Sequence, residues 1–240
     1  MNLNTITWGD GRRTALLLHG ITSNAAGWWR LGPAIAELGY TVVAPDLRGH
    51  GGSPKSDDHL IPSHSTDVRE LADHWDVVIG HSIGGVVATV TAVSDSEWTS
   101  RLILEDPAIY LPDLSAVIVW LMADFDAEVT AASLSDLHPD WSHEDALHKA
   151  EALSQCGPDV VELLFTQNDP FDYRDAVAAL AVPTLVIGAE PGRALIPTEM
   201  GQELAANPSV TFAQVMASHS MHRDAWDDFW AVVSPLLAGP

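Results

Sequence analysis

The chain has 240 residues, 47% of them hydrophobic, and its 33 acidic against 11 basic side chains give a formal net charge of −22. A chain of this length and composition can bury one substantial core, so we expect one domain with an insertion. The negative charge argues against nucleic acid and anionic membranes as partners, because both would repel the protein.

No segment sustains the roughly 18 apolar residues that a membrane span requires. Residues 1–5 lack the basic and apolar regions of a secretory signal. The one cysteine, Cys156, cannot form an internal disulfide, which fits a cytoplasmic location. Because Cys156 precedes a Gly-Pro loop signal and lies in no catalytic motif, we interpret it as a structural thiol.

Strand and helix patterns alternate along most of the chain, which is typical of parallel βαβ units. The predicted strands cover residues 3–8, 14–18, 41–44, 76–79, 102–104, 184–187 and 210–215, the first two forming an opening pair. The predicted helices of this part cover residues 32–38, 65–75, 86–93 and 224–237. The pattern predicts an α/β protein with one doubly wound, mostly parallel sheet.

Residues 110–180 interrupt this alternation. Residues 111–125 and 144–153 have helical apolar periodicity, and Pro139, Gly157-Pro158 and Pro170 punctuate the segment. No strand signal of comparable strength occurs there, so a helical insertion is expected.

The most informative motif is Gly80-His81-Ser82-Ile83-Gly84, which follows a β-branched run and precedes a small apolar helical segment. A serine at such a strand–turn–helix junction sits in a strained turn, where glycines remove Cβ atoms that would clash. The amide of Ile83 then lies at a helix N-terminus, where developing negative charge is favoured. The motif predicts Ser82 as a nucleophile.

Three further motifs accompany this turn: a strand ending in His19-Gly20, the stretch 46–53 (Asp-Leu-Arg-Gly-His-Gly-Gly-Ser), and His219 after the last predicted strand. Together with the serine motif, they resemble the α/β-hydrolase fold family in content and order. The resemblance covers the chain outside residues 110–180. It implies a hydrolase core of residues 1–109 and 181–240 and a small helical cap of residues 110–180 over the active site.

The resemblance also implies the base and the oxyanion hole. The chain has eleven histidines, and the family places its base directly after the last strand, at His219. His222 is the competitor and is expected to line the pocket or cap a helix, while His19, His50 and His81 are interpreted as structural. The backbone amides of Ile21 and Ile83 are expected to hold the oxyanion.

The triad acid departs from the common pattern, because residues 188–197, where many relatives carry an Asp, contain none. Glu190 lies in this loop, and Glu105 ends the strand at 102–104. Some haloalkane dehalogenases of this fold place a Glu at the second position beside a Pro-Gly-x-Leu-Ile-Pro loop like residues 191–197. We therefore expect Glu105 as the acid, with Glu190 as the alternative and Asp106 a distant third. Dehalogenation itself is excluded, because those enzymes use an Asp nucleophile where this chain has Ser82.

Four side chains are expected to line the substrate pocket: Trp28, Trp29, Trp120 and His222. No metal is expected, because no Cys/His set has ligand spacing. No nucleotide cofactor is expected either, because the glycines at 49–52 lack the Lys-Ser/Thr of a phosphate loop.

The resemblance implies a serine hydrolase that cleaves a carboxylic ester or lactone of a small apolar molecule through an acyl-enzyme. Alternatives on the same triad are a carbamate or amide, a thioester, or a carbon–carbon bond. A ligand-sensing receptor of the same fold with slow turnover is the alternative from another class.

Overall fold

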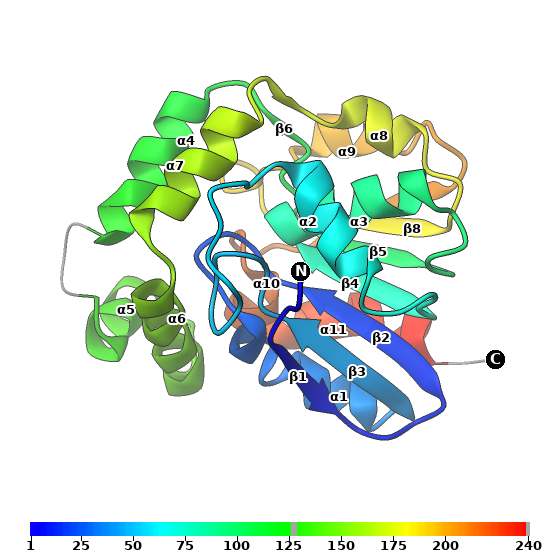
Figure 1. The fold of residues 1–240 in the computed structure, drawn as a ribbon. Coiled ribbons are helices and arrows are strands. Elements are labelled where there is room, and N and C mark those ends of the chain that lie inside the picture. Colours follow the sequence, from blue (N-terminus) through cyan, green and yellow to red (C-terminus); the bar gives the residue numbers. More distant parts are fainter. Residues whose placement is uncertain (126–128, 239–240) are drawn as a thin grey trace.

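A computed structural model of the protein describes residues 1–125 and 129–238. Within these residues the main sheet has seven strands in the order β1-β3-β2-β4-β5-β8-β9 (Figure 1). β1 runs antiparallel to β3, and all other neighbours pair in parallel. The strands are β1 (Thr5–Trp8), β2 (Arg13–Leu18), β3 (Tyr40–Pro45), β4 (Val77–His81), β5 (Leu102–Glu105), β8 (Thr184–Gly188) and β9 (Val210–Gln214). The expected α/β class is confirmed.

Helices cover both faces of this sheet, as its two-sided apolar strands require. Along β2, Leu16 and Leu18 belong to one buried cluster, and Ala15 and Leu17 belong to the other. The first cluster is completed by α2 (Ile61–Arg69), α3 (Ile83–Ser94), α8 (Arg174–Ala178) and α9 (Thr198–Leu204). The second is completed by η1 (Ala25–Trp28), α1 (Leu31–Ala36), α10 (Met221–Asp224) and α11 (Trp226–Leu237).

Residues 110–180 form a mainly helical segment, most of whose helices lie to one side of the sheet, whereas the last one, α8, lies next to α9 (Figure 1). Its helices pack in two pairs, α4 with α7 and α5 with α6. The elements are β6 (Tyr110–Leu111), α4 (Leu114–Met122), η2 (Ala123–Phe125), α5 (Ala131–Leu137), α6 (His143–Gln155), α7 (Pro158–Gln167) and β7 (Phe171–Asp172), followed by α8. Among the described residues, no helix combines the length and apolar character needed to cross a bilayer.

Two sequence predictions for the N-terminal half are wrong in detail. The first two strands do not pair with each other, because β3 and β4 occupy both edges of β2 and leave β1 the outer edge of β3. The helix predicted at 65–75 runs instead over α2, Ile61–Arg69. Pro62 lies in its first turn, where a missing N–H costs nothing. Trp75 is already extended and bridges to Thr99.

Residues 110–180 also differ from the prediction. Gly157-Pro158 begins a helix rather than marking a loop, since Gly157 is the N-cap and Pro158 the first residue of α7. β6 and β7, each two residues long, pair in an antiparallel ribbon that the sequence did not indicate. Strands this short carry no period-2 signal.

Four buried histidines lie close to one another on the α2 side of the molecule. The rings of His19 and His50 are 5.1 Å apart, and those of His59 and His64 are 5.6 Å apart. Among the described residues, neither ring nitrogen of His64 has a hydrogen-bond partner. Burial, with smaller effects from His59 and Arg48, lowers the pKa of His64 to about 3. Burial also lowers the pKa of His50 well below its ordinary value.

Because burial lowers the pKa of these histidines, we expect the free energy of unfolding to fall in mild acid. In the unfolded chain a histidine takes up a proton below pH 6.5, but the folded protein excludes that proton from His64, so acid favours unfolding. For His64 alone, the free energy of unfolding should be about 2 kcal/mol lower at pH 5 than at pH 7. Urea unfolding at both pH values measures this difference.

The control is His64→Leu, which removes the titrating ring and keeps an apolar side chain in the core. Its loss of stability between pH 7 and pH 5 should be smaller than that of the wild type. Equal losses in both proteins would show that other groups cause the acid sensitivity.

Candidate active site

Ser82 lies at the tip of a sharp turn between β4 and α3. Its φ of 53° and ψ of −118° are strained for a residue with a side chain, at a cost of about 1–3 kcal/mol. Only glycine fits beside it: a Cβ on Gly84 would lie 2.2 Å from the carbonyl oxygen of Leu18, and one on Gly80 would lie 2.6 Å from that of Gly84. The turn therefore combines a strained serine with two glycines that a side chain could not replace.

The backbone of Ser82 is fixed to the end of the neighbouring strand. The Ser82 amide donates to the carbonyl of Glu105 at 3.0 Å, and the Ala108 amide donates to the carbonyl of Ser82 at 3.1 Å. The position of Ser82 thus depends directly on the residues that follow β5.

His219 and Asp106 form an imidazole–carboxylate pair at the same edge of the sheet. His219 Nδ1 lies 2.7 Å from Asp106 Oδ2, and the Asp106 side chain is fully buried. Because a carboxylate accepts, Nδ1 is the donor, which leaves Nε2 as the nitrogen that can take a proton. The amides of Leu195 and Ile196 donate to the same carboxylate at 2.9 and 3.0 Å. The loop after β8 therefore fixes the Asp106 carboxylate through two backbone amides.

The expected pairing of Glu105 with His219 is not what the structure has. Side chains alternate along a strand, so Glu105 faces the side of Ile103 and meets His222 there. Asp106, one residue later, has a φ of 35° and turns toward His219. Glu190, the alternative acid, does not pair with His219 either. Its carboxylate lies 3.3 Å from the Arg193 guanidinium.

The loop after β2 carries Ile21. Its amide is expected to form the oxyanion hole together with the amide of Ile83. Leu47 donates its amide to His19 Nε2 at 2.9 Å, so His19 Nδ1 carries the proton and donates to the Gly20 carbonyl at 2.8 Å. His19 thus fixes the start of this loop, in agreement with its expected structural role. Ile83 begins α3, where an amide has no partner within the helix.

Helix α6 contacts this loop from outside the sheet. The Lys149 ammonium donates to the carbonyl and hydroxyl of Thr22 at 3.0 and 2.6 Å. Thr22 has a φ of 58° and directly follows Ile21. Trp29 donates its indole N–H to Asp145 at 2.8 Å. The conformation of the loop is therefore tied to the helical segment.

The four expected pocket residues do not lie together. Trp28 is buried in the core, with its ring 4.6 Å from that of His222, and His222 is also buried. Trp29 is partly buried against α6. Trp120 is 68% exposed on α4, in contrast to the buried Trp28 and His222.

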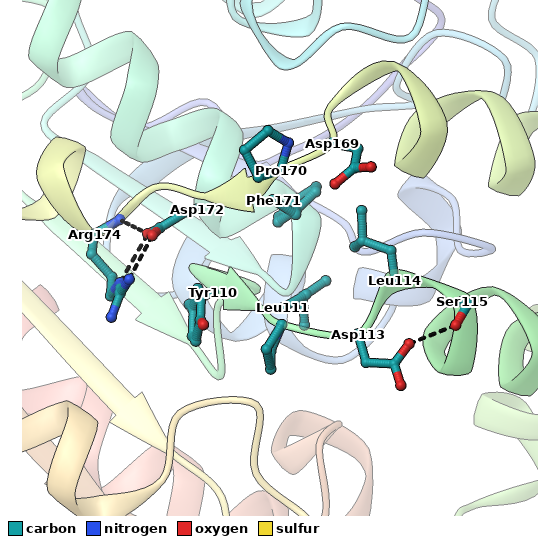
Figure 2. A pocket seen from close by; sticks show the side chains of 11 residues that line it. Tyr110, Leu111, Asp113, Leu114, Ser115, Asp169, Pro170, Phe171, Asp172 and Arg174 are labelled. Carbon is teal, nitrogen blue, oxygen red and sulfur yellow. Dashed lines mark hydrogen bonds and ion pairs between the residues drawn. The ribbon is translucent and has the colours of Figure 1, made fainter.

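The described residues form a hollow elsewhere, at the base of the helical segment (Figure 2). Its volume is about 510 Å³, and it is lined by residues 110–115, 169–172 and 174. Arg174 lies over the Tyr110 ring and pairs with Asp172 there. None of Ser82, Asp106 or His219 lines this hollow, so we do not assign the chemistry to it.

Neither metal chemistry nor thiol chemistry is supported by the described residues. Within the described ranges, no three His, Cys, Asp or Glu side chains gather as metal ligands. Cys156 is buried, and burial raises the pKa of its thiol to about 11. A thiol so rarely ionised at neutral pH is a poor nucleophile, which agrees with its interpretation as structural.

The comparisons with known proteins agree with this geometry. The alpha/beta hydrolase family model matches residues 15–232. Lipase LipV of Mycobacterium tuberculosis is 35% identical over 106 residues, covering 42% of this chain and 40% of LipV. The match thus spans about two fifths of the length of LipV and 31% of the length of three other mycobacterial proteins.

Other relatives match over nearly the whole length. N-formylmaleamate deformylase of Pseudomonas putida is 24% identical, with 98% of this chain and 92% of that protein covered. The solved N-formylmaleamic acid deformylase Nfo from P. putida has a TM-score of 0.80 at 29% identity, covering 96% and 94% of the two chains. The enol-lactonase of Burkholderia xenovorans shares the fold, with a TM-score of 0.80 at 20% identity over 99% and 96%. Because the family model matches most of its length, the chain belongs to the alpha/beta hydrolase family.

Proposed function

We propose that this protein is a serine hydrolase that cleaves a carboxylic ester or lactone of a small apolar molecule. The observation that carries the proposal is the pair formed by His219 Nδ1 and the buried Asp106 carboxylate, 2.7 Å apart, beside the strained Ser82 turn. A serine hydroxyl needs a base to become nucleophilic at neutral pH, and the base needs a partner that fixes its tautomer.

In the first half of the reaction, Ser82 Oγ attacks the carbonyl carbon and its proton passes to His219 Nε2. Asp106 stabilises the imidazolium that results, through the hydrogen bond at Nδ1. The tetrahedral intermediate collapses when the carbon–oxygen bond to the leaving alcohol breaks, and His219 returns the proton to that alcohol. In a lactone the alcohol stays attached to the acyl group.

In the second half, water attacks the carbonyl carbon of the acyl-enzyme. His219 takes one proton from this water and gives it to Ser82 Oγ as the acyl bond breaks, which restores the free enzyme and releases the acid. Both halves pass through a tetrahedral oxyanion. We assign the amides of Ile21 and Ile83 as the donors that bind it.

We also propose that residues 110–180 form a helical cap on a core of residues 1–109 and 181–240. Support comes from contacts between the two parts near the site. Lys149 of α6 binds Thr22, and Trp141, in the turn before α6, donates to Asp224 at 2.6 Å. Substrate bound between these parts would lie next to Ser82, in the place where this architecture forms its pocket.

An amide is the second candidate substrate. The full-length relatives named deformylases support it, since a formyl group on nitrogen is an amide. The same residues serve this reaction, with His219 protonating a leaving nitrogen instead of an oxygen. A panel of esters, lactones and N-formyl amides assayed with the purified protein ranks the two candidates by kcat/KM.

The role of Ser82 predicts that Ser82→Ala abolishes turnover and leaves the fold intact. The alanine keeps the same Cβ in the turn, so the melting temperature should change little. The rate on a short-chain nitrophenyl ester should fall by several orders of magnitude. Activity above about a tenth of the wild-type rate would refute the assignment. Stoichiometric release without further turnover by the wild type would favour the receptor-like alternative.

The acid assignment predicts a contrast between two carboxylates. Asp106→Asn should lower kcat by about three to four orders of magnitude, because an amide can favour the wrong tautomer of His219. Glu190→Gln should be nearly silent, since the Glu190 carboxylate pairs with Arg193 of its own loop rather than with His219. Steady-state kinetics of both variants, with melting temperatures as the control for folding, measure the contrast. A dead Glu190→Gln and an active Asp106→Asn would place the acid in the loop after β8.

A further inference from the structure

A second imidazole–carboxylate pair lies behind the first. His222 Nδ1 is 2.8 and 2.9 Å from the two oxygens of Glu105, and the His222 amide donates to the same carboxylate at 2.9 Å. Glu105 is fully buried, and His222 is 6% exposed. The reaction described above uses neither residue.

The two pairs hold the two ends of one short turn. Asp106 binds His219 at its start, and Glu105 binds both the ring and the amide of His222 three residues later. Glu105 and Asp106 are consecutive at the end of β5, so the turn with the base is attached to the strand that also fixes the Ser82 backbone. Movement of His222 relative to Glu105 would move the base relative to the nucleophile.

His81 connects the two histidines on the side of the nucleophile. It donates from Nε2 to the carbonyl of His219 at 3.0 Å, since a carbonyl only accepts. Its ring lies 4.5 Å from the His219 ring and 5.3 Å from the His222 ring. Burial, and then the neighbouring His219 and His222, lowers the pKa of His81 well below its ordinary value, so His81 is neutral. Trp28 covers the other side of His222.

Few charges surround the second pair. From α10, Arg223 is buried beside it, and burial lowers the pKa of the Arg223 guanidinium while the charges of Asp145, Glu105 and Asp224 oppose that effect. Asp106, which directly follows β5, His81 on β4 and His219 are further titratable groups near the pair. The Glu105 carboxylate is therefore a buried negative charge close to the base, in a region where screening by water is weak.

We propose that Glu105 and His222 are positioning residues for His219: their hydrogen bonds fix the turn that carries the base, and the Glu105 charge favours the protonated base that forms during the reaction. This inference rests on the proposed function, since it assumes that His219 activates Ser82.

The test uses diisopropyl fluorophosphate, which forms a bond from Ser82 Oγ to phosphorus with loss of fluoride and needs no knowledge of the substrate. Its second-order rate constant is measured from pH 5 to pH 9 for the wild type and for three variants. His222→Leu removes the ring donor. His222→Asn keeps a donor at the Nδ1 position. Glu105→Gln keeps an acceptor and removes the charge.

We expect His222→Leu to react at least about tenfold more slowly than the wild type, because small displacements of a base are costly. His222→Asn should recover most of that loss. Glu105→Gln should move the acidic limb of the pH profile to lower pH by about half a unit or more, because the base then binds a proton less readily. A purely structural pair would lower melting temperatures without moving this limb.

Unchanged rates in both His222 variants together with an unmoved limb in Glu105→Gln would overturn the inference while leaving the proposed function intact. If His222→Leu fails to fold, the pH profile of Glu105→Gln decides alone. A wild-type protein whose Ser82 does not react would overturn the proposed function, and the inference with it.

Discussion

Strand β5 ends between the Ser82 turn and the loop after β8, and the residues at its end, Glu105 and Asp106, are hydrogen-bonded on both sides. The Glu105 carbonyl accepts from the Ser82 amide, and the Asp106 amide donates to the Ile187 carbonyl on β8. The two side chains then bind two histidines of the C-terminal segment. The proposed nucleophile, base and acid are thus all attached to one point in the sheet, which would give the rigidity that a catalytic arrangement needs.

The same edge of the sheet receives the loop after β2. His19 fixes this loop from the core side, through Leu47 and Gly20, and Lys149 of α6 fixes it from the other side, at Thr22. The positive φ of Thr22 is sustained by these contacts on either side of Ile21. A helical segment that contacts both this loop and the turn after His219 can couple its own position to the geometry around Ser82.

Much of this site could be predicted from sequence, because it lies in local motifs. The Ser82 turn is determined by its glycines, and His219 follows the last strand directly. Glu105, the expected partner of His219, lies at the correct strand end but one residue before Asp106, the carboxylate that His219 contacts. Period-2 alternation turns Glu105 to the face of His222, and the positive φ that turns Asp106 the other way has no signature in the sequence.

The fold, too, was predictable where it depends on local sequence and not where it depends on contacts between distant segments. Long periodic elements such as α3 and α11 agree with their patterns. The pairing of β2 with β3 instead of β1 depends on how distant strands compete for the edges of β2. A short stretch of sequence does not contain that information. Trp120 was expected in the pocket because apolar side chains favour burial, yet it lies exposed on α4, since Leu121 and not Trp120 faces the neighbouring helix layer.

The central claim is that the reaction passes through an acyl group on Ser82. The most direct measurement is acid quenching of the protein during turnover of nitrophenyl butyrate, followed by mass spectrometry of its peptides. The account predicts a butyryl increment on the peptide that contains Ser82, localised to that residue. Continued turnover with Ser82 unmodified, or an increment on Cys156 instead, would contradict it.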